Sequence, residues 1–168
     1  MIGWIVFFRL VLAALCLSGC SQGAARREVG PEDPTIRYTG WFDRRDPKAV
    51  RFAWPGSQIE IQFAGTGLEV RLNEAPRRRG ETDWLTVVID DRAPTTIALT
   101  RGTHVYELAK GLAPGSHRAL LWKRTEAEVG TVTLRGFVVH GATGAAVTAP
   151  PGKKRRLIFI GDSITAGY

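Results

Sequence analysis

The sequence is poor in cysteine and histidine, the residue types that supply disulfides, many metal ligands and many catalytic bases. It contains two cysteines and three histidines in 168 residues. His104, His117 and His140 form no metal-binding cluster with one another in the sequence, and each is interpreted as a strand or turn residue. Repeats, heptads and long low-complexity runs are also absent, which excludes solenoids and coiled coils. Residues 35–141 show no sustained helical period, so we expect no helical domain there.

The remaining composition is that of an ordinary globular protein with many turns. Hydrophobic residues make up 44% and charged residues 23% of the chain, whose length suits one domain with appendages. Nineteen glycines and nine prolines, many of them between short apolar runs, favour β-structure. The net charge of +7 indicates a surface that tolerates anionic neighbours, but it does not by itself identify nucleic acid as a partner.

The first twenty residues have the properties of an export signal. An apolar segment, interrupted by Arg9, runs from residue 1 to 17 and ends in Leu17-Ser18-Gly19-Cys20. This ending resembles the bacterial lipobox, which implies a signal peptide over 1–19 and lipidation of Cys20. The alternative is an uncleaved membrane anchor, since about twenty apolar residues can span a bilayer. Arg9 near the centre of such a span would cost about 2.5–3.5 kcal/mol on insertion.

Residues 20–34 are expected to be a lipidated tether, because they are polar and contain glycine and proline. Cys16 leaves with the signal, so the mature chain keeps Cys20, acylated, and has no disulfide. Ser21 after this cysteine resembles an outer-membrane sorting context in Gram-negative lipoproteins. We therefore expect an exported bacterial lipoprotein of the cell envelope, anchored to the membrane, in this context the outer membrane, through lipidated Cys20.

Apolar and polar residues alternate repeatedly between residues 35 and 141. Residues 57–63 alternate with period two, and 68–72 repeat the pattern after Gly65-Thr66-Gly67, which predicts a β-hairpin. Further strands are expected over 84–90, 95–100, 103–108, 116–123 and 131–140, with a turn at 90–93. Many short strands at roughly 8–12-residue spacing predict an antiparallel jelly-roll β-sandwich over 35–141.

Four tryptophans follow the signal: Trp41, Trp54, Trp84 and Trp122. Aromatic rings in a sandwich can form a platform for sugars, but most tryptophans of small sandwiches pack in a core or between domains. Trp122 alternates with Leu120 and is expected in the core. For Trp41 and Trp84 both interpretations stay open, and they are the candidate sugar contacts.

The last stretch, 157–168, joins four apolar residues, rich in β-branched types, to Gly161-Asp162-Ser163. This pattern predicts a buried strand that delivers Ser163 to the start of a helix. Free N–H groups and the positive end of the helix dipole would stabilise an anion forming on a substrate carbonyl. A serine that only caps a helix is the alternative.

The ending GDSITAGY resembles the first block of the GDSL, or SGNH, family of serine esterases and lipases. The resemblance implies that Ser163 is the nucleophile, that its own N–H contributes to the oxyanion hole, and that no metal or organic cofactor is needed. The family takes its base from a later Asp-x-x-His block and further oxyanion donors from a Gly and an Asn. None of these blocks can be placed here, because the sequence stops five residues after Ser163. The three histidines present do not match the Asp-x-x-His pattern, since Arg101, Pro114 and Phe137 stand three positions before them.

A second resemblance spans residues 35–168. The segments that carry it are similar to the N-terminal domain of carbohydrate esterase family 2; they are 38–42, 65–68, 115–117, 121–126 with Gly130, and 134–137. In that family a jelly-roll domain precedes an SGNH hydrolase domain that removes acetyl groups from sugars. The resemblance implies a linker over 142–152, the start of the hydrolase domain over 153–168, and an acetylated poly- or oligosaccharide as substrate.

Two basic runs do not indicate nucleic-acid binding. Arg77-Arg78-Arg79 is expected in a solvated loop, with a contact to anionic glycans or lipid head groups as the alternative. Residues 153–156 are interpreted as the polar lead-in to a strand. An exported protein does not encounter the genome, so nucleic acid is not an expected partner.

The sequence therefore predicts the N-terminal part of a secreted, lipid-anchored carbohydrate esterase that removes acetyl groups through Ser163. The 168 residues lack the catalytic histidine and the Gly and Asn blocks, so we expect the chain itself to be inactive, whether it is a piece of a longer chain or a short protein. The rival is a non-catalytic carbohydrate-binding or interdomain packing β-sandwich.

Overall fold

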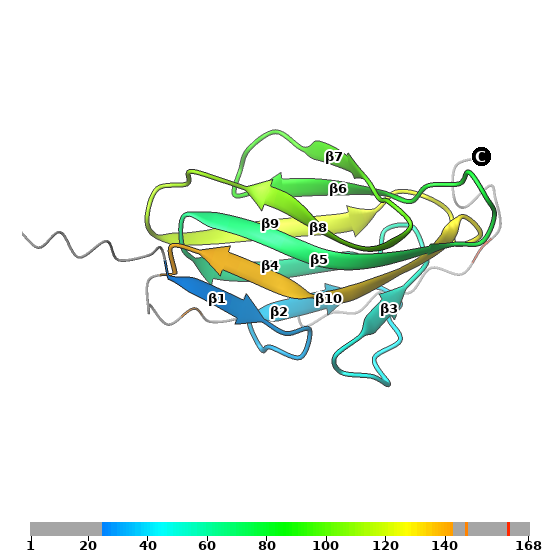
Figure 1. The fold of residues 1–168 in the computed structure, drawn as a ribbon, viewed down its shortest axis with the longest axis horizontal. Coiled ribbons are helices and arrows are strands. Elements are labelled where there is room, and N and C mark those ends of the chain that lie inside the picture. Colours follow the sequence, from blue (N-terminus) through cyan, green and yellow to red (C-terminus); the bar gives the residue numbers. More distant parts are fainter. Residues whose placement is uncertain (1–24, 143–146, 148–160, 162–168) are drawn as a thin grey trace, which may run out of the picture.

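The computed structural model describes residues 25–142 together with residues 147 and 161. Its ten strands form two antiparallel sheets that face each other, and no described residue is helical (Figure 1). The predicted β-sandwich is therefore confirmed. Within the same residues there is accordingly no helix that could cross a membrane. Cys20, Ser163 and the strand expected before Ser163 lie outside the described residues.

The first sheet is built around its longest strand, β10. Its order is β1-β10-β5-β8, and β3 also pairs with β10. The strands are β1 Arg26–Val29, β3 Val50–Phe52, β5 Gly67–Pro76, β8 Gly102–Ala109 and β10 Gly130–His140. One edge of β10 pairs first with β3 and then with β1, while the other edge pairs with β5. A bulge between Leu134 and Gly136 marks the point where the partner changes.

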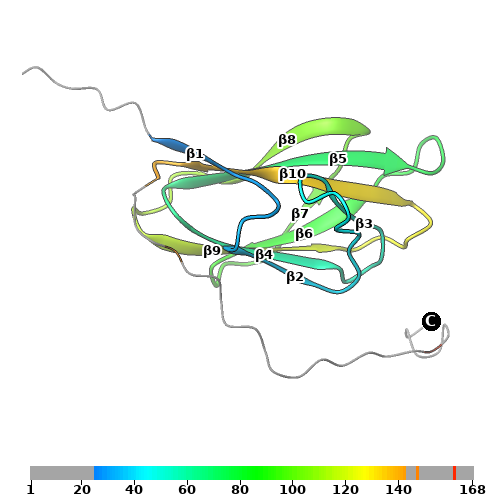
Figure 2. The same cartoon turned by 90° about the horizontal axis from the view of Figure 1, so that it is seen from below.

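The second sheet has the order β2-β4-β9-β6-β7. Its strands are β2 Ile36–Thr39, β4 Gln58–Ala64, β6 Trp84–Ile89, β7 Thr95–Ala98 and β9 Ser116–Lys123. Figure 2 shows the sandwich from its side, with β1, β5, β8 and β10 in one layer and β2, β4, β6 and β9 in the other. The predicted turn at 90–93 joins β6 and β7, which pair antiparallel.

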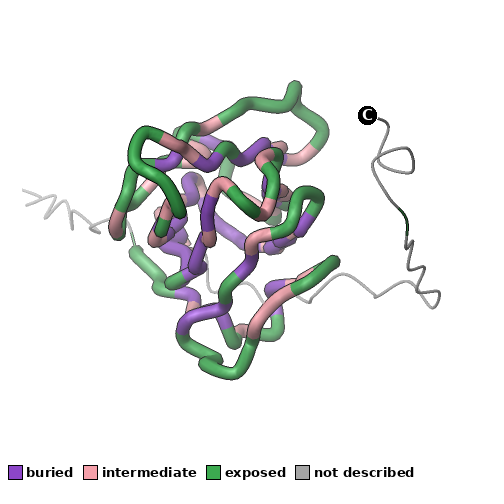
Figure 3. Tube along the Cα trace, turned by 90° about the vertical axis from the view of Figure 1, so that its right-hand side faces the viewer, coloured by how far each residue is buried: buried purple, intermediate pink, exposed green. Residues whose placement is uncertain are grey.

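The core fills the space between the sheets, because the central strands of both sheets turn alternate apolar side chains inward. Ile61 of β4, Leu68 and Val70 of β5, and Leu134 of β10 are fully buried members of one hydrophobic cluster. Full burial of one such side chain contributes about 1.5–3 kcal/mol. Figure 3 shows the buried residues gathered in the interior and the exposed ones in the connecting loops. The core thus holds the two sheets at a fixed separation and leaves their outer faces for other contacts.

The hairpin predicted between 57–63 and 68–72 is wrong. β4 belongs to the second sheet and β5 to the first, so the connection crosses from one layer to the other. Its N–H groups bind elsewhere: Gly65 donates to the Gly115 carbonyl (3.0 Å, N···O) and Thr66 to the His140 carbonyl (2.8 Å). Alternation of period two is the same in a hairpin and in two strands of facing sheets, so the pattern could not separate them.

The tether expected over 20–34 is wrong for residues 26–29, which form β1. Val29 is buried and lies opposite Phe137 of β10. Beyond the strand, the Pro31 carbonyl accepts a hydrogen bond from the Tyr38 hydroxyl (2.7 Å). The other three residues of β1 are exposed, so the strand shows no apolar alternation. Its conformation comes from backbone pairing with β10, a partner more than one hundred residues away.

Trp122 is not in the core, contrary to the prediction. Ala119, Leu121 and Lys123 are the buried residues of β9, so Leu120 and Trp122 lie on the outer face of the second sheet, half-buried. Both faces of this strand carry apolar residues. A lysine normally indicates the solvent-facing side of a strand, but Lys123 lies on the buried side.

Candidate functional site

A polar cleft lies on the outer face of the first sheet. Its volume is about 650 Å³. The floor comes from β3, β10 and β5, where Arg51 lies opposite Thr133 and Thr133 lies opposite Asn73. These residues point outward because their strand neighbours Val50, Phe52, Val132 and Leu134 are buried in the core. The remaining lining residues are Asp43, Arg45, Asp46, Ala49, Ala75, Thr131 and Arg135.

A second hollow of about 440 Å³ continues this cleft. The two share Asp43, Arg45, Arg51 and Thr131, and the second adds Trp41, Phe42, Phe52, Ala53 and Trp54. We call the two hollows together the Trp–Arg groove. Trp41 is 70% and Trp54 59% exposed, well above what tryptophan shows in a core. Large exposed aromatic surface of this kind usually marks a binding or docking site.

Tight loops hold the two indoles in place. Trp41 follows Gly40, whose φ of +107° turns the chain at the end of β2 and which lies against the Ser57 backbone. Trp54 begins a turn that is closed by the Ser57 N–H donating to the Trp54 carbonyl (3.2 Å). Phe42 packs against Phe52, with ring centroids 5.3 Å apart, and so anchors the Trp41 loop to β3. Both exposed rings are therefore carried by short segments tied to the sandwich.

The groove contains charges of both signs. Asp43 accepts two hydrogen bonds from the Arg45 guanidinium (Nε–Oδ1 2.9 Å, Nη2–Oδ2 2.7 Å). These bonds hold the pKa of the Asp43 carboxyl well below its usual range, so it is ionised. Asp43 also joins β3 through backbone hydrogen bonds in both directions with Arg51. The loop is thus fixed by its own ion pair, and Arg51 and Arg135 contribute further positive charge to the lining.

The structure brings Trp41 together with Trp54 and not with Trp84. Trp84 begins β6 in the second sheet, 44% exposed, and does not line the groove. Sequence reasoning left Trp54 out of the candidate contacts. Its setting in Trp54-Pro55-Gly56 is a turn signal, and a tryptophan in a turn is less suited to the core than one in an alternating strand.

The three histidines do not meet at one site. His104, His117 and His140 all lie in strands, on β8, β9 and β10. His117 is the one paired closely with an aspartate, since Nδ1 lies 2.9 Å from Asp90 Oδ2. Its Nε2 lies 2.8 Å from the Ala113 carbonyl oxygen, so both ring nitrogens face acceptors, an arrangement that favours the doubly protonated ring. Burial lowers the pKa of His117, but these two hydrogen bonds outweigh it and the net pKa is raised.

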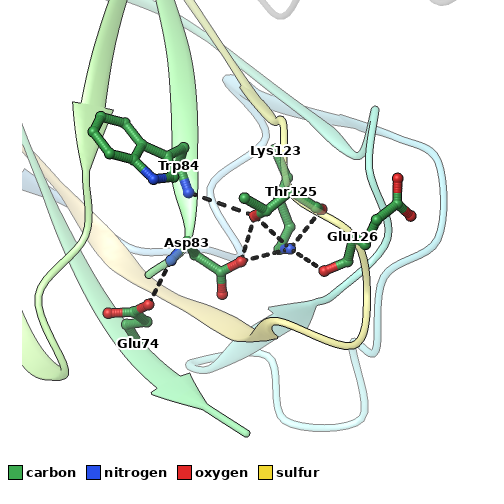
Figure 4. Close-up of polar contacts among 6 residues, drawn as sticks. All are labelled: Glu74, Asp83, Trp84, Lys123, Thr125 and Glu126. Atoms are coloured by element: carbon green, nitrogen blue, oxygen red, sulfur yellow. Dashed lines mark hydrogen bonds and ion pairs between the residues drawn. The ribbon is translucent and has the colours of Figure 1, made fainter. Parts of the chain in front are cut away.

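A buried charged cluster lies at one end of the second sheet (Figure 4). The Lys123 side chain is fully buried, and Nζ contacts Asp83 Oδ1 (2.6 Å), the Thr125 carbonyl and hydroxyl oxygens (2.7 and 2.9 Å) and the Glu126 carbonyl (3.0 Å). The Asp83 N–H donates to Glu74 Oε1 (2.7 Å). Burial raises the pKa of Glu74. Every donor of Lys123 is used inside the protein, so the cluster holds a loop and offers no open position to a substrate.

No group of three or more potential metal ligands occurs among the described residues. Ser163 and Cys20, the predicted nucleophile and lipidation site, lie outside them, so their roles stay predictions.

Comparison with known proteins places this fold in a family. The profile named Carbohydrate esterase 2 N-terminal matches residues 38–151. The chain is 36% identical over 137 residues to the cellulase/esterase CelE of Acetivibrio thermocellus, covering 82% of this chain and 16% of that protein. It is 26% identical over 162 residues to an acetylxylan esterase / glucomannan deacetylase of Cellvibrio japonicus, covering 94% of this chain and 44% of that protein.

A solved structure shares both sequence and fold with the chain. The family two carbohydrate esterase of Clostridium thermocellum, in complex with cellohexaose, superposes with a TM-score of 0.65 at 35% identity. The match covers 79% of this chain and 39% of that one. The chain thus spans less than half the length of each of these proteins. With a profile match over most of its length, the chain belongs to the family of carbohydrate esterase 2 N-terminal domains.

Proposed function

We propose that this chain is the N-terminal part of an exported, lipid-anchored esterase that removes acetyl groups from sugars. The observation that carries the proposal is the order of its parts. A family domain over residues 38–151 is followed directly by a strand-like segment and Gly161-Asp162-Ser163. The relative from Cellvibrio japonicus is named for removing acetyl groups from xylan and glucomannan, which supports the substrate class.

The proposed chemistry is two-step acyl transfer. Ser163 Oγ loses its proton to a base and attacks the acetyl carbonyl carbon; the sugar oxygen then leaves with a proton. Water hydrolyses the acetyl-serine ester, which releases acetate and restores the hydroxyl. The Ser163 N–H would stabilise the oxyanion, together with further donors of a complete hydrolase domain. His117 is not suited to be the base, because both of its ring nitrogens face hydrogen-bond acceptors.

The proposed location follows from the predicted signal peptide over residues 1–19. Lipidation of Cys20 would tie the mature chain to the membrane, and residues 21–25 would then separate the lipid from β1. The substrate would accordingly be met in the cell envelope or outside it.

Substitution of the serine tests the proposal. In a version of the protein that continues through a complete hydrolase domain, Ser163→Ala should lower kcat for 4-nitrophenyl acetate by about 10³-fold or more. Ser116→Ala, at an exposed position of β9, should leave the rate unchanged. The 168-residue chain should hydrolyse the ester no faster than its own Ser163→Ala variant. Retained activity in the extended Ser163→Ala protein would rule out Ser163 as the nucleophile.

The Trp–Arg groove favours a second function for the sandwich, namely non-catalytic binding of carbohydrate. Two exposed indoles beside outward hydroxyl, amide and charged side chains suit a sugar, whose rings have apolar faces and polar rims. This function would not depend on Ser163.

A further inference from the structure

The floor of the Trp–Arg groove carries two arginines, Arg51 and Arg135, that form no close ion pair within the described part of the chain. Neither Arg51 nor Arg135 lies within ion-pair distance of a carboxylate among the described residues, whereas seven other described arginines form such pairs. Asp43 is near enough to Arg51 for the arginine's charge to help lower the pKa of its carboxyl, but it makes no ion pair with Arg51. Both are exposed, and both line the larger hollow. Arg51 projects from β3, and Arg135 projects from the bulge of β10, two residues beyond the point opposite Arg51.

The surroundings of these arginines do not neutralise them. The groove and the loop above it contain five cationic side chains, Arg44, Arg45, Lys48, Arg51 and Arg135, against the carboxylates of Asp43 and Asp46. Asp43 is already paired with Arg45. Asp46 Oδ1 accepts a hydrogen bond from the Lys48 backbone N–H (2.9 Å), so this side chain stabilises the turn at residues 46–48. The guanidinium groups of Arg51 and Arg135 therefore remain available to a ligand.

A guanidinium presents paired N–H donors that match a carboxylate or phosphate in a bidentate way. The two indoles suggest which kind of molecule carries the anion. A sugar ring can stack on each, and Asn73 and Thr131 add polar groups to the groove lining. Nucleic acid carries a charge on every nucleotide, and two free arginines beside two carboxylates suit that density poorly.

We infer that the Trp–Arg groove binds a polysaccharide that carries carboxylates, such as a uronic-acid-substituted xylan. Trp41 and Trp54 hold the sugar backbone, and Arg51 and Arg135 bind the carboxylates. This inference rests on the second proposed function, that the sandwich binds carbohydrate, and it adds the class of carbohydrate and the residues that select it.

Binding of two matched polymers tests the inference. The 168-residue chain is titrated calorimetrically with glucuronoxylan and with the same xylan after reduction of its carboxyl groups to alcohols. We expect about three- to tenfold tighter binding of the acidic polymer, since each exposed ion pair contributes modestly. Raising salt from about 0.05 M to about 0.5 M should remove this difference by screening and leave binding of the reduced polymer unchanged.

Variants assign the selectivity to residues. Arg51→Gln combined with Arg135→Gln should abolish the preference while keeping the affinity for the reduced polymer. Arg92→Gln, at an exposed arginine of the β6–β7 turn, is the matched control and should keep the preference. Trp41→Ala with Trp54→Ala should weaken binding of both polymers about tenfold, whereas Trp84→Ala should not. The substituted side chains are exposed, so the fold is expected to persist, which circular dichroism checks.

The outcomes distinguish selectivity for acidic polysaccharides from carbohydrate binding in general. Equal affinity for both polymers, or a preference that survives in the double arginine variant, would overturn the inference and leave carbohydrate binding intact. Binding of neither polymer would overturn both. Poly-uridylate bound as tightly as glucuronoxylan would also overturn it, because the groove would then be an unselective cationic surface.

Discussion

At Lys123 the sandwich buries a full charge on the inner face of a strand. Its side chain and that of Asp83 are 0% exposed, and every contact of the ammonium group is internal. Asp83 Oδ2 has no hydrogen-bond partner, and a Cβ at Gly130 would approach it to 2.7 Å. Residues 121–130, part of the segment on which the family resemblance was recognised, therefore serve the structure of a loop.

Removing this cation should be costly. Lys123→Met leaves Asp83 charged, buried and unpaired, so the free energy of unfolding should fall by about 3–5 kcal/mol, measured by urea denaturation. Adding Asp83→Asn should recover part of the loss, because the uncompensated charge is then removed. The neighbouring Arg124→Met breaks only an exposed hydrogen bond to Thr96 (3.1 Å) and should cost less than about 1 kcal/mol. A double variant no more stable than Lys123→Met would show that the lost packing, and not the charge, is decisive.

At the scale of elements, β10 depends on a bulge. One of its edges pairs with β3 over Val132–Leu134 and with β1 over Phe137–His140, and Gly136 lies between the two sets of pairs. Its φ is +131°, and a Cβ there would stand 2.7 Å from the Val29 carbonyl oxygen. The bulge therefore requires glycine for its backbone conformation and for the close approach of β1.

Gly136→Ala should lower the free energy of unfolding by about 2–4 kcal/mol, because a strained backbone and a steric clash act together. Gly111→Ala is the control. Its φ is also positive, at +64°, but no atom lies within 4 Å of the added Cβ. It should cost only about 1 kcal/mol. Equal losses in the two variants, measured by thermal unfolding, would contradict the role given to the contact with Val29.

At the scale of the whole molecule, the first and last strands close the sandwich together, since Arg26 of β1 lies opposite His140 of β10. All residues of the buried cluster fall between Val29 and Val139. A protein of residues 25–142 should therefore unfold in one cooperative transition, within about 2 °C of the 168-residue chain by circular dichroism. Starting instead at Pro31 removes β1 and Val29 and should lower the midpoint by several degrees. Equal midpoints for the two shorter proteins would show that β1 does not stabilise the sandwich.

The sequence by itself determined where most strands lie and that they form a sandwich. Alternation of apolar and polar residues is set by the two-residue period of a strand, so β4, β6, β9 and β10 could be located within one or two residues, whereas β5 extends four residues beyond the expected 68–72. The roles of Ser163 and Cys20 likewise rest on sequence, through the resemblances of GDSITAGY and Leu17-Ser18-Gly19-Cys20.

Only the tertiary structure decided which strands pair and which residues meet. Whether β4 pairs with β5, whether residues 26–29 form a strand, and whether Lys123 faces inward all depend on partners far away in the chain. The same holds for the groove: Arg51 and Arg135 are 84 positions apart in sequence and meet because β3 pairs with β10. Local alternation specifies the two faces of a strand, but the pairing of distant strands selects which face is buried and which side chains become neighbours.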